Sequence, residues 1–471
     1  MNAKFQEKHW IYLSISLVFL TILWGLKNVY FVYELQLNPH KKFILFASIG
    51  ISLIFCNLLL LKKSKLTLFL AIFFYIVITL LLFADVLYER YYDAILDIKL
   101  LEQAGQVSDV LDSVFSLIYK TDWLYWIDIP FVIFMFFLLY KKLPHNKRYN
   151  LKSILMTIIG IFVLLFTSIY PLKPAFSHQY MVSLTGILPT HIYLFAQNFN
   201  FINQSEHLEI KNTELINNIR NEFRKNQALQ KQSPYFGKFK GKNLIIVQAE
   251  SLNTFPIGLK IDGKDVTPNI NKLISVSHYY PNTYLQIGRG NTSDAEFVAN
   301  NSIYPISDKG IYNQYPDNDY LSLANILRDA GYKTFATHGN IPKFWNREQA
   351  YKKQGFQTFF HIDHPLIKKE EIIGLGISDE SIFSQMVKLY KKDAPFYNFI
   401  VTLTNHRPFE LPEKYQLLEL PLKFEGTNTG NYLQSVHYFD FALGKFIEEL
   451  KKADLWDDTI FVIYGDHYGP L

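Results

Sequence analysis

Five long apolar stretches lie within the first 170 residues of this 471-residue chain. Each is about as long as the roughly 17–25 residues that a helix needs to cross the hydrocarbon core of a bilayer. A single stretch of this kind could be a buried core helix, but five in succession favour a membrane domain. The stretches cover residues 10–26, 43–61, 66–83, 123–140 and 153–170. The fourth contains Asp128, which we expect near the outer interface, beside Trp123 and Trp126.

Positive charges gather on one side of this predicted membrane domain. They flank the stretches as Lys4, Lys8, Lys62, Lys63, Lys65, Lys141, Lys142, Lys147, Arg148 and Lys152. The loop on the other side, residues 84–122, is acidic, with Asp85, Glu89, Asp93, Asp97, Glu102, Asp109, Asp112 and Asp122. Because cationic loops stay in the cytoplasm, the N-terminus is predicted to be cytoplasmic. Five crossings then place the residues after about 171 outside the cell.

Composition excludes several classes of function. A net charge of +5 is too weak and too scattered for a nucleic-acid-binding protein. The 40 Phe and 31 Tyr exclude intrinsic disorder. Cys56 is the one cysteine, so neither an intramolecular disulfide nor a cysteine-based zinc cluster can form. A catalytic site in this chain must therefore use oxygen and nitrogen atoms.

The chain changes character after the last apolar stretch. Residues 171–240 are polar and predict a connector with a helix from about 205 to 230. From 241 to 471, strand-like and helix-like segments alternate, which predicts an α/β domain. The expected strands are 243–249, 332–336, 396–403 and 459–464, with an amphipathic helix between the last two.

Polar side chains follow each of these strands. Glu250 ends the first, and His338 follows the second. The third runs into Thr404, Asn405 and His406, and the fourth into Asp466 and His467. Because ligands of open α/β sheets bind at the carboxyl ends of the strands, we expect these residues to form one site.

The residue types suggest a metal and a nucleophile. Glu250, Asp466 and His467 are oxygen and nitrogen ligands that suit Mn²⁺, Mg²⁺ or Zn²⁺. The glycine-containing segment 286–297 presents Thr292, whose hydroxyl beside a divalent cation could become a nucleophile. Thr292 or Ser293 could instead be an ordinary helix N-cap.

A second polar cluster lies in the segment 338–348. His338, Trp345 and Arg347 could bind a phosphate and a small polyol, since Arg grips phosphate with two hydrogen bonds. Ordinary surface packing is the alternative for these three residues.

These motifs resemble those of the lipoteichoic acid synthase family, whose members are polyglycerol-phosphate transferases with a sulfatase-like (alkaline-phosphatase superfamily) outer domain. The segments that carry the resemblance are PYFGKFKGKN, QAESLNTFPI, VTPNINKL, GRGNTSDAEFVANNSIYP, HGNIPKFWNRE, TNHRPF and IYGDHYG. The resemblance implies five membrane helices, a connector and an extracellular α/β domain. It also implies that Thr292 is the nucleophile.

The resemblance further implies the roles of the other site residues. Glu250, Thr292, Asp466 and His467 would hold Mn²⁺, with Mg²⁺ or Zn²⁺ as alternatives. The glycerol-phosphate pocket would be lined by His338, Trp345, Arg347 and His406. Thr292 would attack phosphatidylglycerol, release diacylglycerol, and pass the glycerophosphoryl group to the growing polymer or its glycolipid anchor.

One departure from the family pattern concerns the end of the chain. The family continues well beyond the last metal pair, whereas this sequence ends at Leu471. We therefore expect a C-terminally truncated outer domain, with all four expected ligands present.

Three other functions remain open from the sequence. Phosphoethanolamine transferases of the same fold also use Thr, but they usually carry disulfides that this chain lacks. A primase-type relative would add only the first glycerol-phosphate unit. An inactive, truncated membrane scaffold would regulate a full-length synthase.

Overall fold

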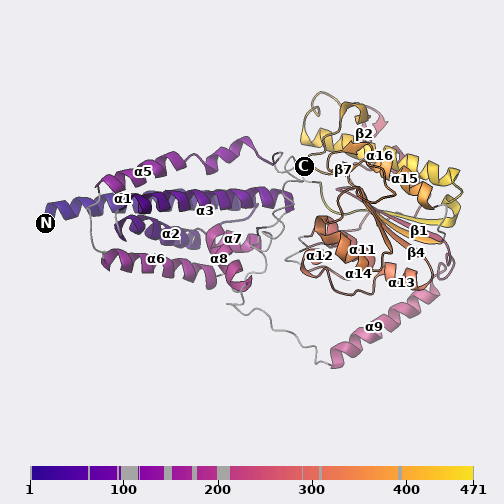
Figure 1. Ribbon diagram of the computed structural model, residues 1–471, viewed down its shortest axis with the longest axis horizontal. Coiled ribbons are helices and arrows are strands. Elements are labelled where there is room, and N and C mark those ends of the chain that lie inside the picture. The colour runs from indigo at the N-terminus through magenta and orange to yellow at the C-terminus, as the bar shows by residue number, and fades with distance from the viewer. Residues whose placement is uncertain are drawn as a thin grey trace. The chain divides into compact units, whose positions relative to one another are not determined.

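The computed structural model describes residues 3–61, 64–92, 95–96, 115, 117–142, 151–171, 178–198, 213–288, 290–306, 310–390 and 395–469. The chain divides into two compact units (Figure 1). The first contains Met1–Val107 and Val114–Leu208, and the second contains Glu209–Leu471. Outside the described residues lie several charges used for the predicted orientation: Lys62, Lys63, Asp93, Asp97, Glu102, Asp109, Asp112, Lys147 and Arg148.

The first unit is built from long apolar helices. They are α1 (Ala3–Glu34), α2 (Lys41–Leu61), α3 (Lys65–Tyr92), α5 (Ile129–Lys142) and α6 (Leu151–Ile169), with a short 3₁₀ helix η2 (Lys120–Tyr125) before α5. Five segments among the described residues are long and apolar enough to cross a membrane. The five long apolar segments predicted from the sequence are thus present as helical segments.

Two of these helices run further than the apolar pattern predicts, because their charged residues find partners inside the bundle. In α1 the helix continues through Lys27, whose Nζ lies 2.7 Å from Asp128 Oδ1. In α3 it continues through Arg90, whose guanidinium binds Asp122 at 2.7 and 2.8 Å and Glu34 at 3.0 Å. A charge that is paired can remain in a membrane helix, which an apolar-length rule does not take into account.

The side chain of Asp128 has partners inside the first unit. It is buried, ion-paired with Lys27, and accepts a hydrogen bond from the Tyr75 hydroxyl. Lys27 of α1 and Tyr75 of α3 thus accommodate this carboxylate, and its place near the outer interface stays a prediction.

Residues that we assigned to the connector form two short helices of the first unit, α7 (His178–Thr185) and α8 (Ile187–Asn198). Asn28 of α1 accepts a hydrogen bond from the Ile187 backbone N–H at 2.8 Å. His191 Nε2 lies 2.7 Å from Asp85 Oδ2 of α3. At Gly186, where φ is 86°, a Cβ would come within 2.5 Å of Asn28 Oδ1, so this contact requires glycine.

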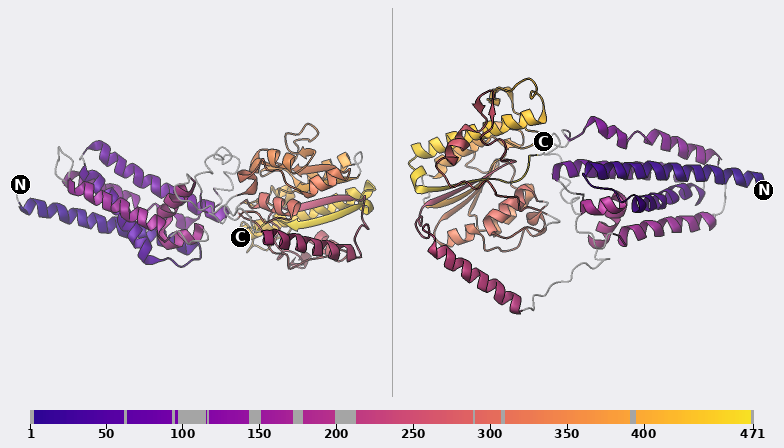
Figure 2. Two further views of the ribbon diagram at one scale, coloured as in Figure 1. Left: turned by 90° about the horizontal axis from the view of Figure 1, so that it is seen from below. Right: turned by 180° about the vertical axis from the view of Figure 1, so that it is seen from behind.

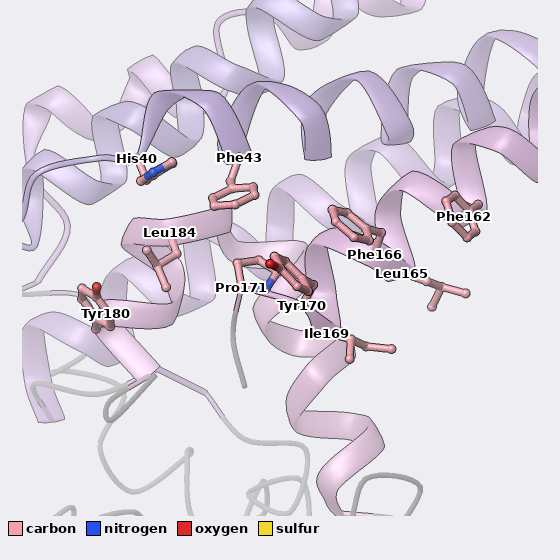
Figure 3. A pocket seen from close by; sticks show the side chains of 10 residues that line it. All are labelled: His40, Phe43, Phe162, Leu165, Phe166, Ile169, Tyr170, Pro171, Tyr180 and Leu184. Carbon is pink, nitrogen blue, oxygen red and sulfur yellow. The ribbon is translucent and has the colours of Figure 1, made fainter. Parts of the chain in front are cut away.

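A groove opens on the first unit between the start of α2, the end of α6 and α7 (Figure 3). It has a volume of about 1310 Å³. Its lining is mostly apolar and consists of His40, Phe43, Phe162, Leu165, Phe166, Ile169, Tyr170, Pro171, Tyr180 and Leu184. Because α2 begins and α6 ends at this groove, it lies at one boundary of the membrane-spanning segments.

The second unit is a parallel sheet with helices on both faces (Figures 1 and 2). Its strand order is β5-β4-β8-β1-β9. The strands are β1 (Asn243–Ala249), β4 (Lys333–His338), β5 (Thr358–Phe360), β8 (Phe396–Val401) and β9 (Thr459–Gly465). The four strands expected from the sequence are confirmed, and β5 is additional.

Alternating side chains divide the core between the two faces of the sheet, as a period of two residues requires. On one face, Ile245 and Val247 of β1 pack with α10 (Pro268–Ile274), α15 (Asp379–Tyr390) and α16 (Asn428–Lys452). On the other face, Ile246 packs with α11 (Thr292–Asn301), α12 (Ile311–Gln314), α13 (Leu323–Asp329) and α14 (Arg347–Lys353).

The remaining elements of the second unit lie outside the large sheet. α9 (Thr213–Gln232) precedes β1, and its described side chains are almost all exposed. Two antiparallel pairs are formed by β2 (Lys260–Ile261) with β3 (Lys264–Asp265), and by β6 (Ile372–Ile373) with β7 (Gly376–Ile377). The short 3₁₀ helices are η3 (Phe344–Asn346), η4 (Glu413–Tyr415) and η5 (Trp456–Asp458).

The buried ion pair of the first unit gives a testable prediction. Lys27→Met leaves the Asp128 carboxylate buried without its cation, which costs about 3–5 kcal/mol in buried pairs. We expect a lower melting temperature of the full chain in detergent, with most of the loss recovered by Lys27→Met/Asp128→Leu. Lys142→Met, at an exposed lysine, is the control. An unchanged melting temperature of Lys27→Met would contradict this account.

Candidate active site

Three potential metal ligands meet at the carboxyl edge of the sheet. Ala249 of β1 pairs with Gly465 of β9, so the following residues, Glu250 and Asp466, lie next to each other. His467 Nε2 lies 3.3 Å from Glu250 Oε1 and 3.6 Å from Asp466 Oδ2. One ligand atom from each residue lies within 4.8 Å of the others. The parallel register thus produces the cluster that the sequence predicted.

Hydrogen bonds hold both carboxylates in place. Asp466 Oδ1 accepts from the backbone N–H groups of Ser251 and His467, each at 2.8 Å. Glu250 Oε1 accepts from the Ser251 hydroxyl at 2.9 Å. At Gly465 a Cβ would lie 2.0 Å from the Leu252 carbonyl oxygen, so the tight turn that presents Asp466 requires glycine.

The charge balance of the cluster favours a cation. Burial and the negative charge of Glu250 raise the pKa of Asp466 to about 7. Burial acts to lower the pKa of His467, but Asp466 and Glu250 raise it to about 10. Burial likewise acts to raise the pKa of Glu250, yet His467 lowers it to about 2. Two buried carboxylates thus require positive charge beside them, and a divalent cation fits this oxygen and nitrogen donor set.

Thr292 lies at the same cluster. It is the first residue of α11 and is 8% exposed. Its Oγ1 lies 3.2 Å from His467 Nε2, and its carbonyl accepts a hydrogen bond from Gln248 of β1 at 3.0 Å. The N-cap position is Asn291, with φ of 39° and no side-chain cap bond. Because Ser293 Oγ donates to the Gly290 carbonyl, neither hydroxyl serves as the N-cap that the sequence allowed.

Asp294 shapes the loop that presents Thr292. Its carboxylate accepts hydrogen bonds from the N–H groups of Gly288 at 3.0 Å, Gly290 at 2.8 Å and Ile311 at 3.0 Å. Burial nevertheless raises its pKa to about 6. A Cβ at Gly290 would lie 2.3 Å from Asp294 Oδ1, so the loop can close around this carboxylate only with glycine there.

His338 is the last residue of β4 and is buried. Its Nδ1 lies 3.0 Å from the Val401 carbonyl oxygen and must donate to it, which leaves Nε2 as an acceptor. Burial, together with the charge of Arg347, lowers the pKa of His338 to about 3, so the imidazole is neutral at physiological pH. His406 is half-buried, with Nδ1 2.8 Å from the Arg407 carbonyl oxygen. The side chain of the neighbouring Asn405 binds the Glu250 carbonyl, so the loop that carries His406 lies at this cluster.

Arg347 and Trp345 differ in exposure. Arg347 is 1% exposed and pairs with Glu296 at 2.7 Å, so surface packing does not describe it. Trp345 is half-buried in η3, with φ of 58°, and a Cβ at Gly310 would lie 3.2 Å from its ring. The same Cβ at Gly310 would lie 3.1 Å from the Gly290 Cα. Trp345 therefore stands beside the loop that presents Thr292.

Asp379 is a site residue that lacked a clear sequence signal. It begins α15, and its Oδ1 accepts from the Leu403 N–H at 2.8 Å, in the loop that carries His406. Burial raises the pKa of Asp379 to about 6. The sequence predicts Asn405 at the site, but not the hydrogen bond that its Nδ2 donates to the Glu250 carbonyl at 2.8 Å. The partners of Asp379 and Asn405 lie far away in the sequence, so spacing alone could not reveal these contacts.

Comparison with known proteins decides the family. The lipoteichoic acid synthase N-terminal domain matches residues 1–206, and the sulfatase family matches residues 242–471. A lipoteichoic acid synthase of Staphylococcus saprophyticus is 32% identical over 468 residues, covering 93% of this chain and 71% of that protein. The chain belongs to the lipoteichoic acid synthase family.

Two further members of the lipoteichoic acid synthase family are similar to this chain. Lipoteichoic acid synthase 2 of Bacillus subtilis is 32% identical over 474 residues, which cover 97% of this chain and 72% of that protein. The crystal structure of the lipoteichoic acid synthase LtaP from Listeria monocytogenes is 34% identical, with a TM-score of 0.48 over 50% of this chain and 58% of that one.

Membership of the lipoteichoic acid synthase family confirms the resemblance seen in the sequence and the predicted fold class. Five apolar helices precede a sulfatase-like α/β domain with a parallel sheet. The chain is thus a multi-pass membrane enzyme of a sulfatase-like phosphotransferase family.

The cluster gives a second prediction. A divalent cation that binds only the folded state raises the melting temperature, by the equivalent of about 2.7 kcal/mol at 100 times its Kd. We expect Mn²⁺ to do this for the full chain in detergent, and Glu250→Gln to reduce the shift because one of the two buried carboxylates is lost. Glu425→Gln, at an exposed glutamate, is the control. Equal Mn²⁺ shifts in both variants would count against the site.

Proposed function

We propose that this chain transfers glycerol phosphate from phosphatidylglycerol to a growing polyglycerol-phosphate chain or to its glycolipid anchor. The observation that carries the proposal is Thr292 Oγ1 at 3.2 Å from His467 Nε2, within the Glu250, Asp466 and His467 cluster of a lipoteichoic acid synthase family member. A hydroxyl next to potential metal ligands has the arrangement of an activated nucleophile.

The proposed reaction has two displacements at phosphorus. In the first, Thr292 Oγ forms a bond to the phosphorus of phosphatidylglycerol while the phosphorus–oxygen bond to diacylglycerol breaks. The proton lost by Thr292 is balanced by the proton that the diacylglycerol hydroxyl gains. In the second, an acceptor hydroxyl of the polymer or anchor attacks the glycerophosphoryl-threonine, and Thr292 recovers its proton.

The cofactor of the proposal is Mn²⁺, with Mg²⁺ or Zn²⁺ as alternatives. Glu250, Thr292, Asp466 and His467 would hold it. When bound, the cation would lower the pKa of the Thr292 hydroxyl and neutralise charge on the phosphate oxygens. The two carboxylates raise the pKa of His467, and a bound cation would take the place of the proton on that imidazole.

The substrate pocket of the proposal is lined by His338, Trp345, Arg347 and His406. Neutral His338 can accept a hydrogen bond from a glycerol hydroxyl through Nε2. Arg347 supplies positive charge for the phosphate, and Trp345 an apolar wall for the glycerol carbons. His406 lies on the loop that Asp379 fixes, at the carboxyl end of β8.

Replacement of the proposed nucleophile tests the mechanism. We expect Thr292→Ala to abolish diacylglycerol release from phosphatidylglycerol by the full chain in proteoliposomes with Mn²⁺, because no side-chain oxygen remains to attack phosphorus. Thr254→Ala, at an exposed threonine, should release diacylglycerol like the unaltered protein. Equal release by Thr292→Ala would reject the threonine mechanism, and no release by the unaltered protein would favour an inactive scaffold.

The proposed topology places the N-terminus in the cytoplasm and the second unit outside the cell. The cationic flanks of the apolar stretches support this orientation. The lipid donor and the acceptor would then meet the enzyme at the outer leaflet.

Cysteine labelling tests the topology, since Cys56 is buried and can be removed. In a Cys56→Ala background, we expect a membrane-impermeant maleimide to label Thr254→Cys in intact cells. Lys142→Cys, at the cytoplasmic end of α5 in this topology, should react only after the cells are broken. The reverse pattern would invert the topology.

A further inference from the structure

Glu296 is a buried carboxylate one helical turn beyond Thr292 on α11. Its Oε1 accepts two hydrogen bonds from Arg347, from Nε at 2.9 Å and from Nη2 at 2.7 Å. Its Oε2 accepts from the Tyr351 hydroxyl at 2.7 Å. Both oxygens are thus occupied, and the carboxylate is held between two residues of α14.

The third guanidinium nitrogen of Arg347 does not bind Glu296. Nη1 is buried and has no hydrogen-bond partner among the described residues. Buried donors are almost always paired, so an unpaired one needs an explanation. A purely structural ion pair would not require an unpaired Nη1, because the carboxylate of Glu296 could bind the guanidinium through both terminal nitrogens, Nη1 and Nη2.

The surroundings of Arg347 place its charge at the candidate pocket. Thr292 and Glu296 are four residues apart on α11 and so lie on one face of that helix, which brings the guanidinium bound to Glu296 close to Thr292. Arg347 also lies two residues after Trp345 in the chain, and Trp345 stands beside Gly310 and the loop that presents Thr292. A phosphate at Thr292 would therefore meet this positive charge.

We propose that Glu296 is a positioning residue, which takes up Nε and Nη2 of Arg347 and so reserves Nη1 for a phosphate oxygen of the glycerol-phosphate headgroup. This inference rests on the proposed function. It assigns to Glu296 the orientation of the arginine that binds the substrate phosphate. Because Glu296 and Thr292 share one helix, the nucleophile and the phosphate-binding arginine are positioned together.

Binding of glycerol phosphate to the full chain in detergent, measured by calorimetry, tests the proposal. We expect Glu296→Gln to weaken binding about 10-fold, since the charge that orients Arg347 is removed while the side-chain shape is kept. Glu348→Gln, the same change at an exposed neighbour on α14, should bind like the unaltered protein. Tight binding by Glu296→Gln would overturn the proposal.

A double-variant cycle shows whether Glu296 acts through Arg347. If it does, Glu296→Gln/Arg347→Gln should bind no more weakly than Arg347→Gln alone, whereas independent effects would multiply and contradict the proposal. If Glu296→Gln does not fold, Glu296→Asp keeps the charge, and its binding should fall between the unaltered protein and Arg347→Gln.

Measurements of binding and of turnover distinguish the positioning role of Glu296 from the proposed function. An unaltered protein that binds glycerol phosphate but releases no diacylglycerol would refute the proposed function. The double-variant cycle would then still test the positioning role of Glu296. An unaltered protein that does not bind glycerol phosphate would overturn the role of Glu296.

Discussion

Two buried carboxylates at the carboxyl edge of a parallel sheet are the constraint on which the second unit depends. Glu250 and Asp466 lie side by side because β1 and β9 pair in register, and both are almost fully buried. Like charges in a buried site repel, so the pair is stable only with a positive charge beside it. A protonated His467 would supply that charge, and a divalent cation would supply it more fully.

The helix α11 connects this constraint to the rest of the site. Thr292 begins the helix at the cluster, Asp294 closes the preceding loop, and Glu296 holds Arg347. Each of the two acids is buried, and each binds a segment distant in the sequence. The nucleophile and the phosphate-binding arginine that we propose are therefore both attached to α11, which would limit the error in their separation.

Pattern and spacing predict much of this architecture. Apolar length alone predicts five crossings, and the residues that follow β1, β4, β8 and β9 predict a shared site because parallel strands end at one edge. Thr292, Glu250, Asp466 and His467 are brought together as expected.

Contacts between distant residues are what the sequence could not reveal. The pairing of Lys27 with Asp128 joins two helical regions that are far apart in the sequence. Residues 178–198 read as a connector, although α7 and α8 pack on the membrane helices through Asn28 and Asp85. The sequence left Arg347 open between phosphate binding and surface packing, since nothing in its spacing from Glu296 indicates a buried pair.

The central claim is that Thr292 carries the glycerophosphoryl group between donor and acceptor. Mass spectrometry of the full chain, quenched during turnover of phosphatidylglycerol in the absence of acceptor, tests it most directly. We expect one glycerophosphoryl group on the peptide that contains Thr292. The same group on a different side chain, or release of diacylglycerol with no modified peptide, would contradict it.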